Sequence, residues 1–148
     1  MNILDALLGE HAALLTLFEF IDRDSAHMGL DRLHETGLLL ERMLLAHATL
    51  EDHLLFDSVP DARGGLKAAL DAMHEEHIEL GSELGRLREA ASEPAARGAL
   101  ARVLAVTREH FAVEERVLFA LVAQRLGAEK LAELGAAWKR RRLPEAAA

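Results

Sequence analysis

The 148-residue chain contains no cysteine and carries a formal net charge of −8. The absence of cysteine excludes disulfides, thiolate metal sites and cysteine nucleophiles, so any metal site must use His, Asp or Glu, and the acidic balance argues against a nucleic-acid partner. No apolar run approaches the roughly 20 residues that span a bilayer, and the opening residues MNILDALLGEH lack the basic start of a signal peptide, so we expect a cytoplasmic protein without a membrane partner.

Leucine and alanine dominate the chain and no stretch alternates with a period of two, which predicts an all-α fold. In chain order, we expect helices over residues 3–24, 30–56, 66–90, 92–126 and 128–139. The first four are long and joined by short loops, which is typical of an up-down-up-down antiparallel four-helix bundle. The fifth is a short C-terminal helix.

This organisation predicts a bundle domain over residues 1–127, followed by a short C-terminal helix and basic tail over residues 128–148. The basic stretch KRRR, residues 139–142, is interpreted as a solvated helix end favoured by the helix dipole rather than as a docking signal. On the long helices, apolar residues recur at steps of three and four. The predicted inward positions include Leu8 of the first helix and Val117 of the fourth.

Two segments of the chain repeat one pattern: HATLEDHLLF begins at His47, and HFAVEERVLF begins at His110. In both, a glutamate follows the histidine four residues later, so the two side chains lie on one helix face. The other two long helices each place one histidine in their apolar stripe, His11 within EHAAL and His77 within EHIEL. The two helical hairpins therefore look like one design used twice.

The repeated residues are expected at one level of the bundle. At about 1.5 Å per residue, counted from the hairpin turns, the four histidines fall within roughly one helical turn of the same height. An isolated imidazole or carboxylate in a bundle core costs several kcal/mol of desolvation, an objection that metal coordination removes. The sequence therefore predicts a metal site with the ligands His11, His47, Glu51, His77, His110 and Glu114.

Four imidazoles and two carboxylates form a nitrogen and oxygen ligand set that suits Fe, Mn or Zn better than Mg or Ca. Two carboxylates able to bridge favour two ions over one. Iron is the first choice because such sites leave coordination positions open for oxygen chemistry. Manganese and zinc stay open, as does the alternative that the histidine layer is structural and the chain is a metal-free helical interaction protein.

The remaining histidines are assigned by their positions around the helices. His74 lies one turn and about 60° from His77 and is an additional candidate, either as a ligand, as an outer partner of a ligand or as a flanking residue. His53 is expected on the surface or at an interface, and His27 and His34 are expected to face solvent near a loop.

Four acids adjoin the predicted ligands in sequence and project about 100° away from them. We expect them to face solvent or to accept the second N–H of a metal-bound imidazole. The sequence does not assign them to particular histidines. They are Glu10, Asp52, Glu76 and Glu115.

A lone histidine on the first helix, HxxxE on the second, a histidine on the third and HxxxE on the fourth resemble the hemerythrin-like (HHE cation-binding) family over about residues 3–126. The resemblance implies a four-helix bundle that holds two iron ions, bridged by carboxylates and by an oxo or hydroxo group. It implies the same six ligands, with Glu51 and Glu114 as the bridging carboxylates.

The ligand pattern departs from that of the oxygen-carrying hemerythrins at two points. Those proteins have HxxxH on the third helix, where this chain has Met73 at the first position. They also have a carboxylate five residues after the fourth-helix histidine, whereas here Glu114 lies four residues after His110 and Glu115 lies five after it. Five histidines therefore become four, unless His74 substitutes for the missing one.

We accordingly expect a non-haem di-iron protein that binds or reacts with O₂, peroxide or nitric oxide, in sensing, scavenging or iron handling. The alternative is a non-catalytic metal-binding sensor or interaction module with the same bundle fold. A homodimer, formed through the exposed side of the second helix or through the fifth helix, is an additional candidate arrangement.

Overall fold

The computed structural model describes residues 1–59 and 61–142, so residues 143–148 of the predicted C-terminal segment lie outside the described residues. The helices, in order, are α1 (Ile3–Asp24), η1 (Ser25–His27), α2 (Leu30–Leu54), η2 (Phe56–Ser58), α3 (Gly64–Glu89), α4 (Glu93–Val113), η3 (Glu114–Leu118) and α5 (Phe119–Arg142). The described residues contain no strand. None of the described helices is long and apolar enough to cross a membrane.

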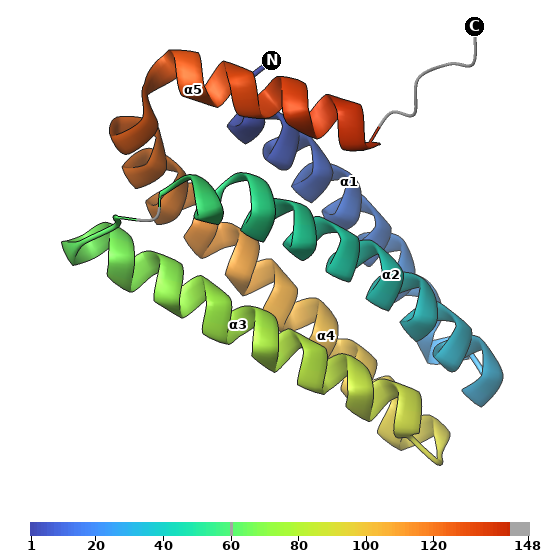
Figure 1. The fold of residues 1–148 in the computed structure, drawn as a ribbon. Coiled ribbons are helices and arrows are strands. Elements are labelled where there is room, and N and C mark those ends of the chain that lie inside the picture. Colours follow the sequence, from blue (N-terminus) through green and yellow to red (C-terminus); the bar gives the residue numbers. More distant parts are fainter. Residues whose placement is uncertain (60, 143–148) are drawn as a thin grey trace, which may run out of the picture.

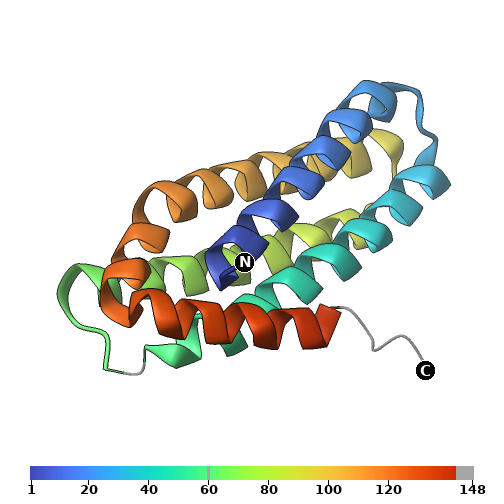
Figure 2. The same cartoon turned by 90° about the horizontal axis from the view of Figure 1, so that it is seen from above.

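Four long helices pack antiparallel, with α1 beside α2 and α3 beside α4 (Figure 1). The first part of α5 continues the direction of α4 as far as Gly127, where a φ of +76° turns the chain. The rest of α5 then crosses the end of the bundle, close to the N-terminus of the chain (Figure 2). The predicted all-α bundle with a C-terminal fifth helix is therefore confirmed.

The helix starts follow the capping signals in the sequence. The Asn2 side chain accepts a hydrogen bond from the backbone N–H of Leu4 at 2.8 Å, and Asp5 accepts one from the N–H of Asn2 at 3.0 Å, which completes a capping box. At the start of α4, the Ser92 side chain accepts from the N–H of Ala95. The first three helices begin and end within about two residues of the expected limits. The predicted fourth helix is divided into α4, η3 and the first part of α5, and the predicted fifth helix forms the rest of α5, which ends at Arg142 instead of residue 139.

The core consists of two apolar clusters, one on each side of the predicted histidine layer. The cluster toward the hairpin turns includes Leu14 and Phe18 of α1 and Leu40 of α2. The cluster toward the N-terminal end of the bundle includes Ile3 and Leu7 of α1 and residues from the second part of α5, Leu131 and Leu134 among them. The histidine layer is thus enclosed between apolar regions.

The prediction that Leu8 faces the core is wrong, because its side chain is 42% exposed while Leu7 is completely buried. The segment contains two adjacent leucine pairs, at residues 7–8 and 14–15. Leu14 lies four residues before Phe18 and Leu15 three residues before it, and both spacings return to the same helix face, so apolar periodicity alone does not distinguish the two registers.

The prediction that Val117 faces the core is also wrong, because its side chain is 45% exposed. The segment η3 is a π-helical turn, which contains more residues per turn than an α-helix. The buried positions that follow Glu114 are therefore Leu118, Phe119 and Val122, and Val117 is turned outward.

Candidate metal centre

The structure brings the six predicted ligands together in one layer between the two apolar clusters. Their donor atoms form two groups of three, and within each group they all lie within 4.8 Å of one another. The groups are His11, His47 and Glu114, and Glu51, His77 and His110. Each group combines both histidines of one helical hairpin with the glutamate of the other hairpin.

Each glutamate lies between the two histidine pairs. Oε2 of Glu114 is 3.4 Å from Nε2 of His11 and 3.8 Å from Nε2 of His110. Glu51 is placed in the same way, 3.5 Å from a histidine of the other hairpin and 4.0 Å from one of its own. A carboxylate in such a position can contact two metal ions, so the arrangement fits the bridging role expected for Glu51 and Glu114.

The two glutamates have no other partners. Both side chains are completely buried, and none of their carboxylate oxygens has a hydrogen-bond partner among the described residues. Burial raises the pKa of Glu51 to about 7, and the charge of Glu114 acts in the same direction. Burial likewise raises the pKa of Glu114 to about 7. Because unpartnered buried carboxylates are costly, these residues fit a bound cation.

Each of the four histidines has a carboxylate next to Nδ1, the ring nitrogen that faces away from the centre. Nδ1 lies 2.7 to 2.8 Å from a carboxylate oxygen in three of them and 3.4 Å away in the fourth, His77. The pairs are Glu10 with His47, Asp52 with His77, Glu76 with His110 and Glu115 with His11. Since an ionised carboxylate only accepts, Nδ1 donates the hydrogen bond in the three short pairs and the Nε2 lone pair is left facing the centre. Asp52 and His77 form an ion-pair contact without a hydrogen bond.

These four contacts run in one direction around the bundle. The acid on α1 contacts the histidine of α2, the acid on α2 contacts the histidine of α3, and the acid on α3 contacts the histidine of α4. Glu115 of η3 closes the circle on His11 of α1. The predicted outer-partner role of the four acids is thus what the structure shows, with an assignment that the sequence left open. We call Glu10, Asp52, Glu76 and Glu115 the carboxylate ring.

The inner nitrogens of the histidines face one another. Nε2 of His11 lies 3.2 Å from Nε2 of His47, and the same distance separates the Nε2 atoms of His77 and His110. With Nδ1 of each ring directed at a carboxylate, two lone pairs would oppose each other unless a proton or a metal ion is shared between them. The imidazole pairs therefore fit a cation as the carboxylates do.

In the metal-free centre, the two histidines of the second hairpin differ in pKa. Burial lowers the pKa of His110 to about 4, and the charge of His77 acts in the same direction. Burial would also lower the pKa of His77, but Asp52 and Glu51 outweigh this effect and raise it to about 9. At neutral pH, His77 is the protonated member of this pair.

The π-helical turn η3 directs two consecutive acids into the layer. Glu114 belongs to one of the two donor groups, and Oε1 of Glu115 lies 2.8 Å from Nδ1 of His11. The acids four and five residues after His110 therefore both take part, one facing the centre and one in the carboxylate ring. Irregular turns of this kind occur frequently at functional sites.

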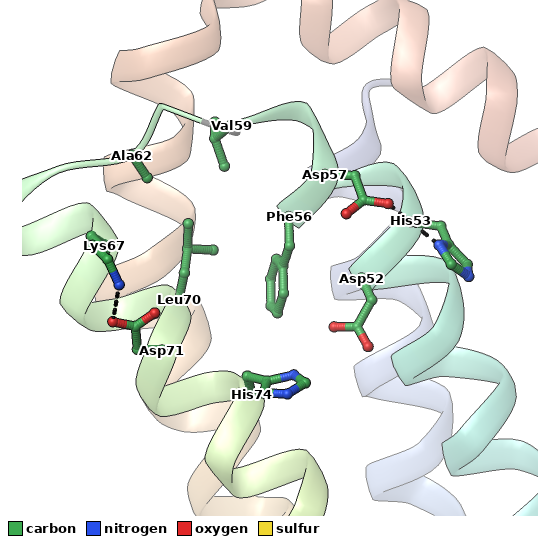
Figure 3. A pocket seen from close by; sticks show the side chains of 10 residues that line it. All are labelled: Asp52, His53, Phe56, Asp57, Val59, Ala62, Lys67, Leu70, Asp71 and His74. Carbon is green, nitrogen blue, oxygen red and sulfur yellow. Dashed lines mark hydrogen bonds and ion pairs between the residues drawn. The ribbon is translucent and has the colours of Figure 1, made fainter.

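His74 belongs to neither donor group. It is exposed and lines a pocket of about 450 Å³ together with Asp52 and Phe56 (Figure 3). The Phe56 ring stacks on His77 with the ring centroids 6.1 Å apart, so this pocket lies directly beside the centre. The structure places His74 in the pocket and apart from the six converging residues.

The other three histidines lie outside the centre. His53 and His27 are exposed, as expected. His34 is half-buried and donates a hydrogen bond from Nε2 to the carbonyl oxygen of Ala90 at 2.9 Å, so the expectation that it faces solvent is wrong. Ala90 caps the C-terminal end of α3, where backbone carbonyls lack partners within the helix.

The interpretation of residues 139–142 as a solvated helix end is wrong for Arg142. Nε of Arg142 donates to Oε1 of Glu10 at 2.7 Å, and the indole N–H of Trp138 donates to the same oxygen at 2.9 Å. The contact joins residues more than 120 positions apart in the sequence, so no local pattern could have indicated it. The second part of α5 therefore contacts the carboxylate ring.

Comparison with known proteins identifies the family. The hemerythrin HHE cation binding domain matches residues 2–122 and also residues 68–137, and the first match contains all six converging residues. The searches of curated proteins and of solved structures found no significant match. Since the family match covers most of the chain, and the histidine and glutamate groups can hold a metal ion, the chain belongs to the hemerythrin HHE cation-binding family.

Proposed function

We propose that the chain is a non-haem di-iron protein that binds or reacts with O₂, peroxide or nitric oxide. In this proposal, one ion is held by His11, His47 and Glu114, and the other by Glu51, His77 and His110. Manganese or zinc would fit the same donors, but iron supplies the redox chemistry that such small ligands require.

The observation that carries the proposal is the pair of fully buried glutamates without hydrogen-bond partners among the described residues. Their burial is unfavourable in the absence of a cation, yet each carboxylate lies within 4.0 Å of a histidine from both hairpins. A structural role does not explain why the costly groups converge in this way.

The protein residues have separate tasks in this proposal. Nε2 of each histidine binds a metal ion, while the carboxylate ring fixes the tautomer and orientation of the imidazoles. Even with both glutamates bridging, each ion would have four protein donors, fewer than an octahedral ion accepts, which would leave positions for an external ligand. The surrounding apolar clusters exclude bulk water from the layer.

Small ligands would approach from the pocket shown in Figure 3. His77 is the most exposed of the four histidines, with 10% of its side chain accessible against 4% or less for the other three. Asp52 and Phe56, which contact His77, line the pocket. The side of the centre that contains His77 is therefore the side proposed to accept an O₂, peroxide or nitric oxide molecule.

A second candidate function is metal-dependent sensing without catalysis, in which occupancy of the centre changes a surface offered to a partner. The specific observation that favours it is the contact of α5 with Glu10 of the carboxylate ring. Addition of O₂, peroxide or nitric oxide to the iron-loaded protein separates the two functions, because only the first predicts a change in the absorption spectrum.

Elemental analysis of freshly purified protein from iron-supplemented cells tests the proposal, together with an absorption spectrum. We expect about two irons per chain from the two donor groups. Glu51→Ala and His110→Ala should lose both metals and lower the thermal stability, because each removes a donor from a shared site. His53→Ala is the matched control on an exposed histidine and should change neither property.

Absence of metal from the wild-type protein, even after anaerobic reconstitution with Fe(II), would contradict the proposal. Unchanged metal content in Glu51→Ala or His110→Ala would contradict the assignment of the ligands.

A cytoplasmic location and a homodimer are further parts of the proposal. Exposed apolar residues on α2, among them Leu38, Leu39 and Leu45, support the dimer, which sedimentation analysis would test.

A further inference from the structure

The second part of α5 ends at the carboxylate ring. After the turn at Gly127, the helix crosses the bundle end over the start of α1 (Figure 2). Its last described turn brings Trp138 and Arg142 to Glu10, the acid that precedes the predicted ligand His11 in sequence. A segment outside the four-helix bundle is thus separated from a predicted metal ligand by a single side chain, that of Glu10.

Glu10 connects α5 to a predicted metal ligand. Its Oε1 accepts from Trp138 Nε1 at 2.9 Å and from Arg142 Nε at 2.7 Å. Its Oε2 accepts from Arg142 Nη2 at 3.0 Å and from Nδ1 of His47 at 2.7 Å. The same carboxylate oxygen therefore contacts both the guanidinium of α5 and the imidazole that faces the centre.

We propose that Trp138 and Arg142 are positioning residues for His47, acting through Glu10, so that docking of the second part of α5 and metal binding stabilise each other. The proposal rests on the proposed metal centre but goes beyond it, because it assigns a role to residues that bind no metal. The coupling is reciprocal by thermodynamic necessity: if docking of α5 tightens metal binding, metal binding must strengthen docking.

Glu10 differs from the other members of the carboxylate ring. Its side chain is 16% exposed, whereas those of Glu76, Glu115 and Asp52 are 31% to 39% exposed. Within residues 1–59 and 61–142, the hydrogen bonds and ion pairs of those three side chains lead only to their histidines. His47 is therefore the one histidine of the layer whose outer carboxylate is clamped by cationic and indole donors.

The carboxylate of Glu10 faces the donors of α5 on one side and Nδ1 of His47 on the other. An ionised Glu10 accepts a hydrogen bond from Nδ1 of His47, which leaves the Nε2 lone pair available to a metal ion.

The docking of α5 is closely fitted, so its effect on Glu10 is transmitted by rigid packing. Leu131 and Leu134 are buried in the cluster that contains the start of α1. Gly135 faces the first residues of the chain, where an added Cβ would lie 2.7 Å from the carbonyl oxygen of Met1 and 2.9 Å from Cα of Asn2. A side chain at residue 135 would therefore push α5 away from α1.

The test compares Arg142→Met with Arg141→Met, which changes the adjacent and exposed arginine. Metal affinity is measured by anaerobic competition between the protein and an Fe(II) chelator. Loss of an outer partner of a metal-bound histidine typically weakens metal binding 10- to 100-fold, so we expect about a 10-fold loss in Arg142→Met. Arg141→Met should retain the wild-type affinity, and both variants should keep the wild-type helical content.

Gly135→Ala provides a second variant that touches neither Glu10 nor the predicted ligands. It should weaken Fe(II) binding in the same direction, because it displaces the helix that carries Trp138 and Arg142. Trp138 is the only tryptophan of the chain, so its fluorescence reports on docking. In the wild-type protein, addition of Fe(II) should change this fluorescence and slow amide hydrogen exchange in residues 128–142.

The outcomes distinguish this inference from the proposed function. Two irons per chain with equal Fe(II) affinity in wild type and Arg142→Met, and equal hydrogen exchange of residues 128–142 with and without metal, would overturn the coupling and leave the metal centre intact. Wild-type protein that takes up no Fe(II) would overturn the metal centre and the coupling with it.

Discussion

The metal-free protein should have a lower free energy of unfolding at pH 9 than at pH 7. In the folded metal-free protein, the pKa of His77 is raised to about 9, and the pKa values of Glu51 and Glu114 are raised to about 7. In the unfolded chain these groups return to ordinary values of 6.5 and 4.5. The folded state therefore binds more protons between pH 7 and 9, and its stability falls as the pH rises through these folded pKa values.

The expected loss of unfolding free energy between pH 7 and 9 is about 3 kcal/mol, obtained by summing the linkage contributions of the three groups. His77 supplies about two thirds of this loss, since it goes from fully to half protonated in the folded state while it is largely neutral in the unfolded chain. Few other groups contribute, because the chain contains no cysteine and no tyrosine, the side chains that ordinarily titrate nearest this range.

The assay is urea unfolding of chelator-treated protein at pH 7, 8 and 9, followed by circular dichroism. His77→Gln should lose most of the pH dependence, whereas His53→Gln, at an exposed position, should retain it. Equal unfolding free energies at pH 7 and 9 in the wild-type protein would refute the reasoning, as would an unchanged dependence in His77→Gln. Iron-loaded protein should lack the effect, because metal ions displace the protons and bind more tightly as the pH rises.

Two further predictions concern packing and the carboxylate ring. Leu7→Ala should lower the unfolding free energy by about 2 to 5 kcal/mol, whereas Leu8→Ala, at an exposed position, should lower it by less than about 0.5 kcal/mol. Both values are measured by urea unfolding, and equal losses would contradict the observed register of α1. Asp52→Glu should close the 3.4 Å gap to Nδ1 of His77 and slow the release of Fe(II) to a chelator by roughly 10-fold; faster release would contradict this role of Asp52.

The convergence of the six residues could be predicted because it depends only on helix geometry. The rise per residue fixes the height of each histidine relative to the nearest turn, and a spacing of four residues fixes which glutamate shares its face. Short loops favour antiparallel neighbours, and four histidines at similar distances from the hairpin turns then fall in a common layer. None of these steps requires knowledge of how the side chains pack.

The partition of the six residues into two groups could not be predicted in this way. Periodicity shows that His47 and Glu51 share a face, and the natural expectation is that they bind the same ion. In the structure Glu51 instead groups with His77 and His110 of the other hairpin. The choice depends on differences of about half an ångström between side-chain distances, which no sequence spacing encodes.

The π-helical turn and the contact of Arg142 were missed for different reasons. An irregular turn changes the register only locally, and the residues of η3, EERVL, are ordinary residues of α-helices that give no sign of a π-helical turn. The pairing of Arg142 with Glu10 depends on the direction that α5 takes after Gly127. A positive φ at a glycine permits this change of direction but does not determine it.

The carboxylate ring, in contrast, follows from the position of each acid directly before or after a predicted ligand in the sequence, combined with the antiparallel order of the helices. Glu10 and Glu76 precede a histidine on α1 and α3, whereas Asp52 and Glu115 follow a glutamate on α2 and the fourth helical segment. A step of one residue rotates the side chain by about 100° around the helix axis. Viewed from one end of the bundle, a step backward on an ascending helix and a step forward on a descending helix rotate in the same sense.

Each of the four acids must therefore turn from the centre toward the next helix in one direction around the bundle, where it meets the histidine that this helix directs inward. This is the direction of the contacts observed from α1 to α2, α2 to α3, α3 to α4 and back to α1. In an antiparallel bundle with an inward ligand layer, an acid that precedes the ligand on one helix and follows it on the next thus predicts a closed ring of outer carboxylates. The same acids spaced uniformly would face one another in pairs and would leave some imidazoles without an acceptor.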